Sequence, residues 1–130
     1  GLGGYLLAPR GGPEAALAVL LARPGARVVQ FRAEGARGEL ALAFAPGVGR
    51  SFLLGTSLEA PPQGRVYQLW MIVDGSPVSG GLFTPRDGTV LVELPADPSS
   101  AQAVAVTVEP PGGSRRPSSP PVFQAPLQSV

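Results

Sequence analysis

Two long apolar runs constrain the fold more than any other feature of this 130-residue sequence. The first, residues 66–74, is apolar at nearly every position and ends in an Asp-Gly pair typical of a tight turn. The second, residues 103–109, alternates valine with other residues and stops at a Pro- and Gly-rich segment. Apolar residues on both faces predict an interior strand that is covered on both sides. We therefore expect two central strands of a β domain, with Trp70 between its layers.

Shorter strands are expected around these runs, because apolar and polar residues alternate between turn signals. The alternation predicts strands at residues 28–33, 39–44, 51–56, 78–83 and 90–94. A short Gly-containing loop joins the first two of these strands, which predicts a hairpin. About seven strands without alternating long helices favour an all-β fold, an antiparallel β-sandwich with a short N-terminal helix. A partly closed barrel is the second architecture that the pattern allows.

The composition changes near both ends of the chain. Residues 1–13 are rich in Gly and Pro, which predicts a flexible lead-in. Pro13 and Glu14 then open an Ala- and Leu-rich run, as at the start of a short helix. We expect the β domain to cover residues 14–123, with Val122-Phe123 adding one edge contact, and a tail to follow at 124–130. The sequence starts without Met and without the basic leader of a signal peptide, so we expect a fragment or a mature product.

The absence of certain residue types narrows the function. The chain has no His, Cys, Lys or Asn, so the usual zinc, haem and iron–sulfur ligand sets cannot form, and most nucleophile and general-base arrangements are closed. We therefore expect no catalytic residue, no metal and no cofactor. All ten cations are arginines, the net charge is +1, and no basic stripe exists, which argues against nucleic acid as a partner. No stretch reaches the roughly 18 apolar residues of a membrane span.

Two aromatic residues in the first run invite a binding role. Tyr67 and Trp70 are three positions apart, so on a strand they point to opposite faces. They could flank a ligand groove, as aromatic residues do in sugar-binding modules. Core burial, with the Trp N–H and the Tyr O–H reaching a polar partner, is the interpretation we favour.

The segment after the second run also has two interpretations. Consecutive N–H groups in Glu109-Pro110-Pro111-Gly112-Gly113-Ser114 could form an anion-binding nest. A phosphate loop of the Walker type would need a lysine, which the chain lacks. We favour a structural role, in which the Glu109 carboxylate accepts hydrogen bonds from Gly113 and Ser114. Each charge-assisted bond of this kind contributes about 1.5–3 kcal/mol.

Two further patterns carry little functional weight. The spacing of Gly75, Gly80, Gly81 and Gly88 does not match a dinucleotide fingerprint, and no helix follows, so turn and bulge roles are favoured. Glu93 and Glu109 sit at strand positions with no second acid near either in sequence. A glycosidase pair therefore stays open but has no positive support.

Three segments of the chain form a recognisable combination: Tyr67-Gln68-Leu69-Trp70, Pro77-Val78-Ser79-Gly80-Gly81-Leu82-Phe83, and Ala103 through Ser114. Together they resemble the C-terminal domain of the anti-sigma-K factor family. They match it in order and spacing over about residues 15–123, and the Thr-Val-Glu-Pro-x-Gly-Gly-Ser element after a Tyr-Gln-Leu-Trp strand is fairly specific. One departure is Pro117-Ser118, where the family commonly shows Pro-Thr.

The resemblance implies a regulatory protein of the cell membrane. Members are single-pass proteins in which a cytoplasmic N-terminal domain sequesters an extracytoplasmic-function sigma factor, a transmembrane helix follows, and this domain lies outside. The inhibitory domain often carries a His/Cys zinc motif, which is absent here, so it would lie upstream of Gly1. Residues 1–13 would then be juxtamembrane and exposed to a site-1-type protease. The rival hypotheses are a secreted or cell-surface β-sandwich that binds carbohydrate or peptide and, less favoured, an enzyme.

Overall fold

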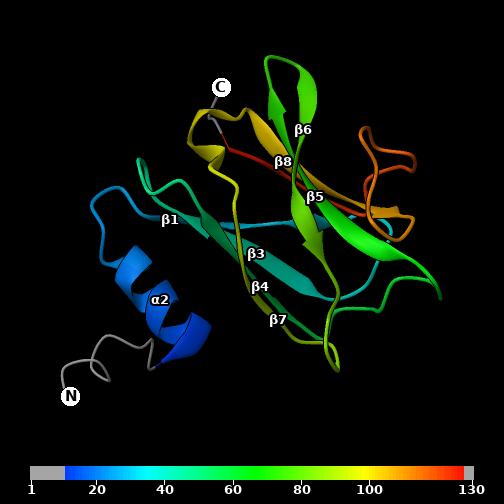
Figure 1. Cartoon of the computed structure of the whole chain (residues 1–130), viewed down its shortest axis with the longest axis horizontal. Coiled ribbons are helices and arrows are strands. Elements are labelled where there is room, and N and C mark those ends of the chain that lie inside the picture. The colour runs from blue at the N-terminus through cyan, green and yellow to red at the C-terminus, as the bar shows by residue number, and fades with distance from the viewer. Residues whose placement is uncertain (1–10, 128–130) are drawn as a thin grey trace, which may run out of the picture.

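The structure, a computed structural model, describes residues 11–127 as two packed antiparallel sheets with one helix outside them (Figure 1). Most of the predicted lead-in 1–13, and the end of the predicted tail, lie outside the described residues. In chain order the elements are α2 (Gly12–Leu21), β1 (Arg27–Gln30), β2 (Arg32–Ala33), β3 (Glu39–Phe44), β4 (Ser51–Thr56), β5 (Val66–Val73), β6 (Ser76–Phe83), β7 (Val90–Leu94), the 3-10 helix η1 (Pro98–Ser100), β8 (Ala103–Glu109) and β9 (Phe123–Pro126).

The strands form a four-stranded sheet in the order β1-β3-β4-β7 and a five-stranded sheet in the order β2-β9-β8-β5-β6. All strand pairs are antiparallel, which confirms the predicted all-β sandwich and the short N-terminal helix. The two apolar runs are β5 and β8. Both lie in the interior of the five-stranded sheet, as the sequence predicted, and they pair with one another.

One continuous core fills the space between the sheets. Alternate residues of each strand point into it, so that the side chains of Tyr67, Leu69 and Met71 on β5 meet those of the facing strands. The Tyr67 ring packs 5.5 Å from the Phe83 ring and 6.5 Å from the Phe123 ring, measured between centroids. The valines of β8 belong to the same core, and Val104 and Val106 are fully buried.

The predicted strand 28–33 is divided between the two sheets. Its first part, β1, pairs with β3 and confirms the predicted hairpin. The chain then crosses at Phe31, whose side chain is buried in the core and whose N–H donates to Leu40 O at 2.9 Å. Its last part, β2, pairs with β9 in the other sheet. Alternation along 28–33 could not reveal this crossing, because the period of two is the same on either side of it.

The C-terminal strand is an interior strand, and the prediction of a single edge contact at Val122-Phe123 was wrong. β9 pairs with β8 on one side and with β2 on the other. Phe123 is fully buried, β9 runs on to Pro126, and Leu127 is buried as well. The short apolar–polar pattern of this segment gave little indication of its position, because its two partners are distant in the sequence.

Two glycine-dependent features of β6 agree with the predicted turn and bulge roles. Asp74 and Gly75 both have positive φ, 52° and 79°, as a two-residue hairpin loop between β5 and β6 requires. The register between these strands shifts between Leu69, which pairs with Gly81, and Trp70, which pairs with Ser79, so that Gly80 forms a bulge. A Cβ on Gly80 would lie 3.0 Å from Leu69 Cδ2, so the core approaches the backbone closely there.

Each sheet is covered on its outer face by a different element. Helix α2 packs on the four-stranded sheet through Leu20, which contacts Ala43 and Phe52. The segment 110–122, which we call the strap, crosses the outer face of the five-stranded sheet and appears in orange at the right of Figure 1. The strap therefore places the Gly-rich segment that follows Glu109 on the outer face of the five-stranded sheet.

Candidate functional site

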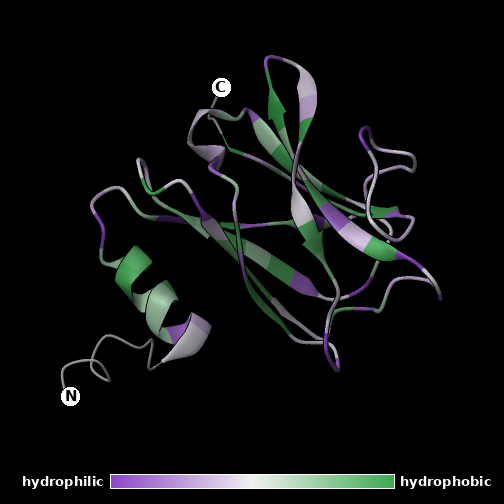
Figure 2. Ribbon diagram, in the orientation of Figure 1, coloured by the Kyte–Doolittle hydropathy of each residue, from purple (hydrophilic) through white to green (hydrophobic). Residues whose placement is uncertain are grey.

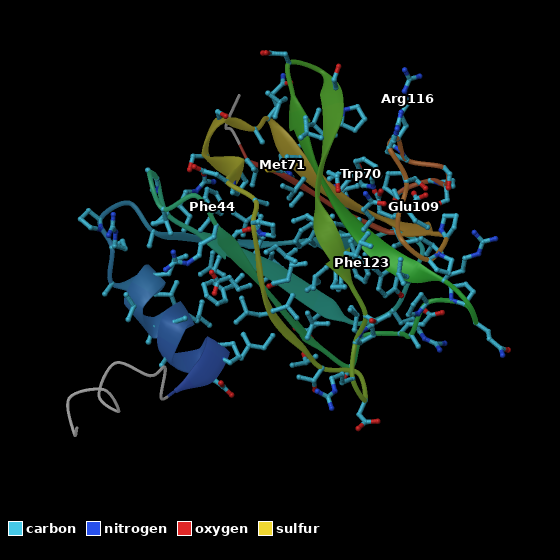
Figure 3. All side chains as sticks on the ribbon, in the orientation of Figure 1. Phe44, Trp70, Met71, Glu109, Arg116 and Phe123 are labelled. Atoms are coloured by element: carbon cyan, nitrogen blue, oxygen red, sulfur yellow. The ribbon has the colours of Figure 1, made fainter. Side chains whose placement is uncertain are left out.

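A fully buried carboxylate lies where β8 meets the strap. Glu109 is the last residue of β8 and has no exposed surface. Its Oε2 accepts from Thr107 Oγ1 at 2.6 Å and from the Ser118 N–H at 3.0 Å. Its Oε1 accepts from Ser114 Oγ at 2.7 Å and from Ser118 Oγ. Figure 3 shows Glu109 beneath the strap and Arg116 at the outer end of the strap, away from the carboxylate.

This carboxylate is charged at neutral pH although it is buried. Burial raises the pKa of Glu109, but the hydrogen bonds from Ser118, Thr107 and Ser114 outweigh this effect and lower the pKa to about 2. None of the ion pairs among residues 11–127 involves Glu109. Hydroxyl and backbone N–H donors alone therefore stabilise the charge, and the strap supplies most of them.

A buried amide makes a second attachment for the strap. Gln68 on β5 accepts from the Ser114 N–H at 2.9 Å through Oε1 and donates to Ser114 O at 3.0 Å through Nε2. The same Nε2 donates to Ser79 Oγ on β6 at 2.8 Å. Gln68 thus binds Ser114 as a neighbouring strand would, and it ties β5, β6 and the strap together.

Trp70 belongs to this outer network, and its predicted place between the layers was wrong. Its indole N–H donates to Thr107 Oγ1 at 2.8 Å, and the same hydroxyl donates to Glu109. Residues 67, 69 and 71 of β5 face the core between the sheets, so the alternation directs Trp70 to the outer face. Trp70 is nevertheless fully buried. The strap covers the outer face of β5, and a strand covered in this way is as apolar on both faces as a strand that lies between two sheets. The sequence pattern therefore could not tell which face of the sheet Trp70 lies on.

The structural interpretation of the Gly-rich segment is confirmed in its principle and corrected in its donors. Ser114 does donate to Glu109, through its hydroxyl. Gly113 does not, because its N–H donates to Pro110 O at 2.9 Å and closes a tight turn. The N–H groups of Gly113 and Ser114 are therefore occupied by protein acceptors, which argues against an anion-binding nest at this place.

The aromatic residues that could have flanked a ligand groove are both in the interior. Tyr67 and Trp70 are 1% and 0% exposed, which confirms the predicted core role and their opposite faces. The Tyr67 hydroxyl donates to Glu59 O at 2.6 Å. Burial, together with the charge of Glu59, raises the pKa of Tyr67 to about 12. Neither ring is available to stack on a sugar, so this observation gives the carbohydrate-binding hypothesis no support.

The two acids that stayed open as a glycosidase pair lie on different sheets. Glu93 is on β7 of the four-stranded sheet and pairs with Arg50, its Oε2 lying 2.9 Å from Arg50 Nε. Glu109 is on β8 of the five-stranded sheet, beneath the strap. The structure therefore does not bring them together. Within residues 11–127, no cluster of three His, Cys, Asp or Glu side chains has a geometry that could hold a metal ion.

One hollow on the described surface lies on the outer face of the four-stranded sheet. Its volume is about 350 Å³, and aliphatic side chains such as those of Ala41, Leu54 and Leu91 form much of its lining. Glu39 is its only charged residue. A single carboxylate offers no acid–base pair, so the hollow carries no catalytic constellation. None of the described helices combines the length and the apolar character needed to cross a membrane.

The sequence analysis missed three residues of the network around Glu109. Gln68, Thr107 and Ser118 were named only as part of the family resemblance and were given no structural role, although each makes hydrogen bonds in this network. A signal was present for the first two. Each interrupts a run that is apolar on both faces, and a polar side chain at an interior strand position needs a buried partner. Ser118 gave no comparable signal, because it lies in an irregular segment.

Residues 5–122 match the family described as anti-sigma-K factor rskA, C-terminal. The chain is 33% identical over 125 residues to the anti-sigma-K factor RskA of Mycolicibacterium vanbaalenii, an alignment that covers 95% of this chain and 52% of that protein. It is 36% identical over 109 residues to an uncharacterized protein in the phr 5' region of Streptomyces griseus, covering 82% and 44%. An RskA of Mycobacterium sp. strain KMS is 42% identical over 74 residues, covering 52% and 29%. No solved structure matches.

The matched range contains the helix, both sheets up to β9, and the whole strap. The chain spans about half the length, or less, of the curated relatives it matches. The elements that carried the resemblance, the Tyr-Gln-Leu-Trp strand and the segment from Thr107 to Ser114, are the ones that meet at Glu109 and Gln68. By this match over most of its length, the chain belongs to the anti-sigma-K factor rskA C-terminal family.

Proposed function

We propose that this chain is the extracytoplasmic regulatory domain of a membrane-anchored anti-sigma factor that controls an extracytoplasmic-function sigma factor. The family supports a regulatory role, and two of the relatives described above carry the name anti-sigma-K factor. In this proposal the sigma-binding domain and the membrane helix belong to the part of the full-length protein upstream of Gly1. The sandwich acts on the sigma factor only through them.

The observation that supports the proposal most is the structural role of residues 107–114, the segment in which the resemblance to the family is most specific. The hydrogen bonds among Thr107, Glu109, Ser114 and Gln68 hold the strap on the outer face of the five-stranded sheet, and this segment presents no reactive group to solvent. In this proposal the segment holds the domain in its closed state. We therefore propose a non-catalytic sensory or protective module whose closed state limits access of a site-1-type protease to residues 1–13.

The test uses the full-length protein in its own bacterium. Deletion of residues 14–127 should change transcription from a promoter of the cognate sigma factor, because the protease would then reach the lead-in regardless of signal. Glu109→Ala, which leaves the strap without its main acceptor, should change transcription in the same direction. Glu39→Gln, an exposed carboxylate on β3, is the matched control and should have no effect.

Two outcomes would contradict the proposal. One is unchanged sigma-dependent transcription after the deletion, at equal amounts of the truncated anti-sigma factor. The other concerns the side of the membrane. An enzyme that folds only outside the cytoplasm, fused after residue 127 of the full-length protein, should be active. An inactive fusion, paired with an active cytoplasmic reporter at the same place, would place the domain inside.

A further inference from the structure

Helix α2 is apolar on the face that it turns away from the sheet. Its inner face packs through Leu20, which is 1% exposed. On its outer side Val19 is 63% exposed and Leu21 is 43% exposed, and alanines occupy the neighbouring exposed positions. Figure 2 shows the hydrophobic colour over the C-terminal half of the helix. A helix that is apolar all round is normally covered on both sides.

A third exposed apolar side chain extends this surface onto the neighbouring strand. Val28 of β1 is 59% exposed. It pairs with Ala43, which packs against Leu20 of α2, so Val28 lies on the same outer face as the helix. We call Val19, Leu21 and Val28 the α2 patch.

Cationic groups stand beside the α2 patch. A hollow of about 160 Å³ lies between the end of α2 and the turn before β4, and Val19, Arg23, Val48 and Arg50 line it. Arg23 forms no ion pair among residues 11–127, and Arg50 forms one, in which its Nε lies 2.9 Å from Glu93 Oε2. A guanidinium offers a planar set of N–H donors that matches the oxygens of a phosphate group.

We propose that the α2 patch rests on an anionic phospholipid surface, with Arg23 and Arg50 holding a lipid phosphate in the hollow between them. Apolar side chains beside arginines are the composition of interfacial membrane contacts, in which the apolar groups enter the boundary between headgroups and acyl chains. The charge of the arginines complements the negative charge of such lipids. The biological setting rests on the proposed function, in which a membrane tether holds the domain close to the lipid.

A second copy of the chain fits this surface less well. The exposed side of a ten-residue helix, about 15 Å long and about 10 Å wide, offers a footprint of roughly 150 Å². A stable protein–protein interface buries about 800 Å² on each partner. A two-fold contact centred on the end of the helix would also bring Arg23 against its own copy. Lipid needs neither a large footprint nor a complementary protein surface.

The experiment is co-sedimentation of the 130-residue chain with vesicles of phosphatidylcholine alone or mixed with phosphatidylglycerol. We expect binding to the mixed vesicles that weakens as salt is added, and much weaker binding to phosphatidylcholine alone. Val19→Ser with Leu21→Ser should reduce binding about tenfold, because two apolar side chains leave the lipid. Arg23→Gln and Arg50→Gln should each reduce it about fivefold.

The matched control is Val78→Ser with Leu82→Ser, which removes two exposed apolar side chains from β6 in the other sheet and should leave binding unchanged. Circular dichroism checks that every variant is folded. Absence of binding by the parent chain, or an equal loss in the control, would overturn the inference. Self-association of the chain that Val19→Ser abolishes would overturn it as well. So would binding of soluble glycerol phosphate that is as strong as binding to the mixed vesicles and that Val19→Ser does not change. A correctly placed topology reporter without vesicle binding would refute this inference alone and leave the proposed function standing.

Discussion

Replacing Glu109 with Gln tests whether the buried charge of this side chain holds the strap on the sheet. The amide has nearly the shape of the carboxylate, so its carbonyl oxygen can still accept from Thr107 and from the Ser118 N–H. Its nitrogen takes the place of Oε1, where the hydroxyls of Ser114 and Ser118 must turn from donating to accepting. The substitution therefore removes the charge with little change in packing.

The magnitude follows from the pKa of Glu109. A pKa lowered from 4.5 to about 2 favours the charged form in the fold by roughly 3 kcal/mol, at about 1.4 kcal/mol for each tenfold change in proton affinity. Hydrogen bonds to a charged acceptor are worth about 1.5–3 kcal/mol each, against about 0.5–1.5 for neutral pairs. We expect Glu109→Gln to lower the free energy of unfolding by ~2–3 kcal/mol, which for a domain of this size lowers the Tm by roughly 10 °C.

The pH dependence gives the sharper assay. The pKa is lower in the folded state than in the unfolded state, so the charge stabilises the fold above about pH 4.5 and this contribution is lost as the pH falls towards 2. Melting curves of the parent and of Glu109→Gln should be far apart at neutral pH and should converge in acid. Glu39→Gln is the control and should track the parent throughout. Equal Tm values at neutral pH, or a gap that stays constant into acid, would refute the reasoning.

Three further predictions concern single positions. Gly113→Ala should destabilise more than Gly112→Ala in a denaturant titration, because both have positive φ but only at Gly113 would a Cβ meet other atoms, Leu82 Cδ2 at 2.8 Å; equal losses would contradict this. Ser118→Thr should keep the stability of the parent and Ser118→Ala should lose about 1–3 kcal/mol, since only the former retains a hydroxyl for Glu109, and the reverse order would be inconsistent with it. Tyr67 should ionise near pH 12 in an ultraviolet titration, and its contribution to stability should be lost as the pH rises from about 10 to 12; ionisation near 10 in the folded protein would show that Tyr67 is exposed.

The sandwich could be predicted from the sequence because its strands are locally encoded. The runs around Trp70 and Val106 are long and strongly apolar, and the Asp74-Gly75 pair fixes the hairpin between β5 and β6. The crossing at Phe31 and the interior place of β9 could not be predicted in this way. Both depend on pairing between residues about ninety positions apart, such as Ala33 with Phe123, and no local pattern specifies such a pairing.

The network around Glu109 was predictable in part, for a physical reason. A lone acid at the end of an apolar strand must find donors, and the Gly-rich segment beside it was the nearest source. Which residues donate to Glu109 depends on how the strap folds back over the sheet. The alternation of apolar and polar residues along a strand does not predict the conformation of such an irregular segment. Ser118 is nine residues from Glu109, and Gln68 is 46 residues from Ser114. The polar interruptions at Gln68 and Thr107 were the better guide, because burial makes each of them seek a partner.

The position of β9, the last described strand, completes the five-stranded sheet by joining β8 to β2. Until residues 123–126 are in place, the valine-rich backbone of β8 has one unpaired edge and β2 has no partner in its sheet. A polypeptide cut just after the strap would keep the hydrogen bonds of Glu109 and yet expose a long, flat template for strand addition. Loss of residues 123–127 would thus leave the edge of β8 open to strand addition and aggregation.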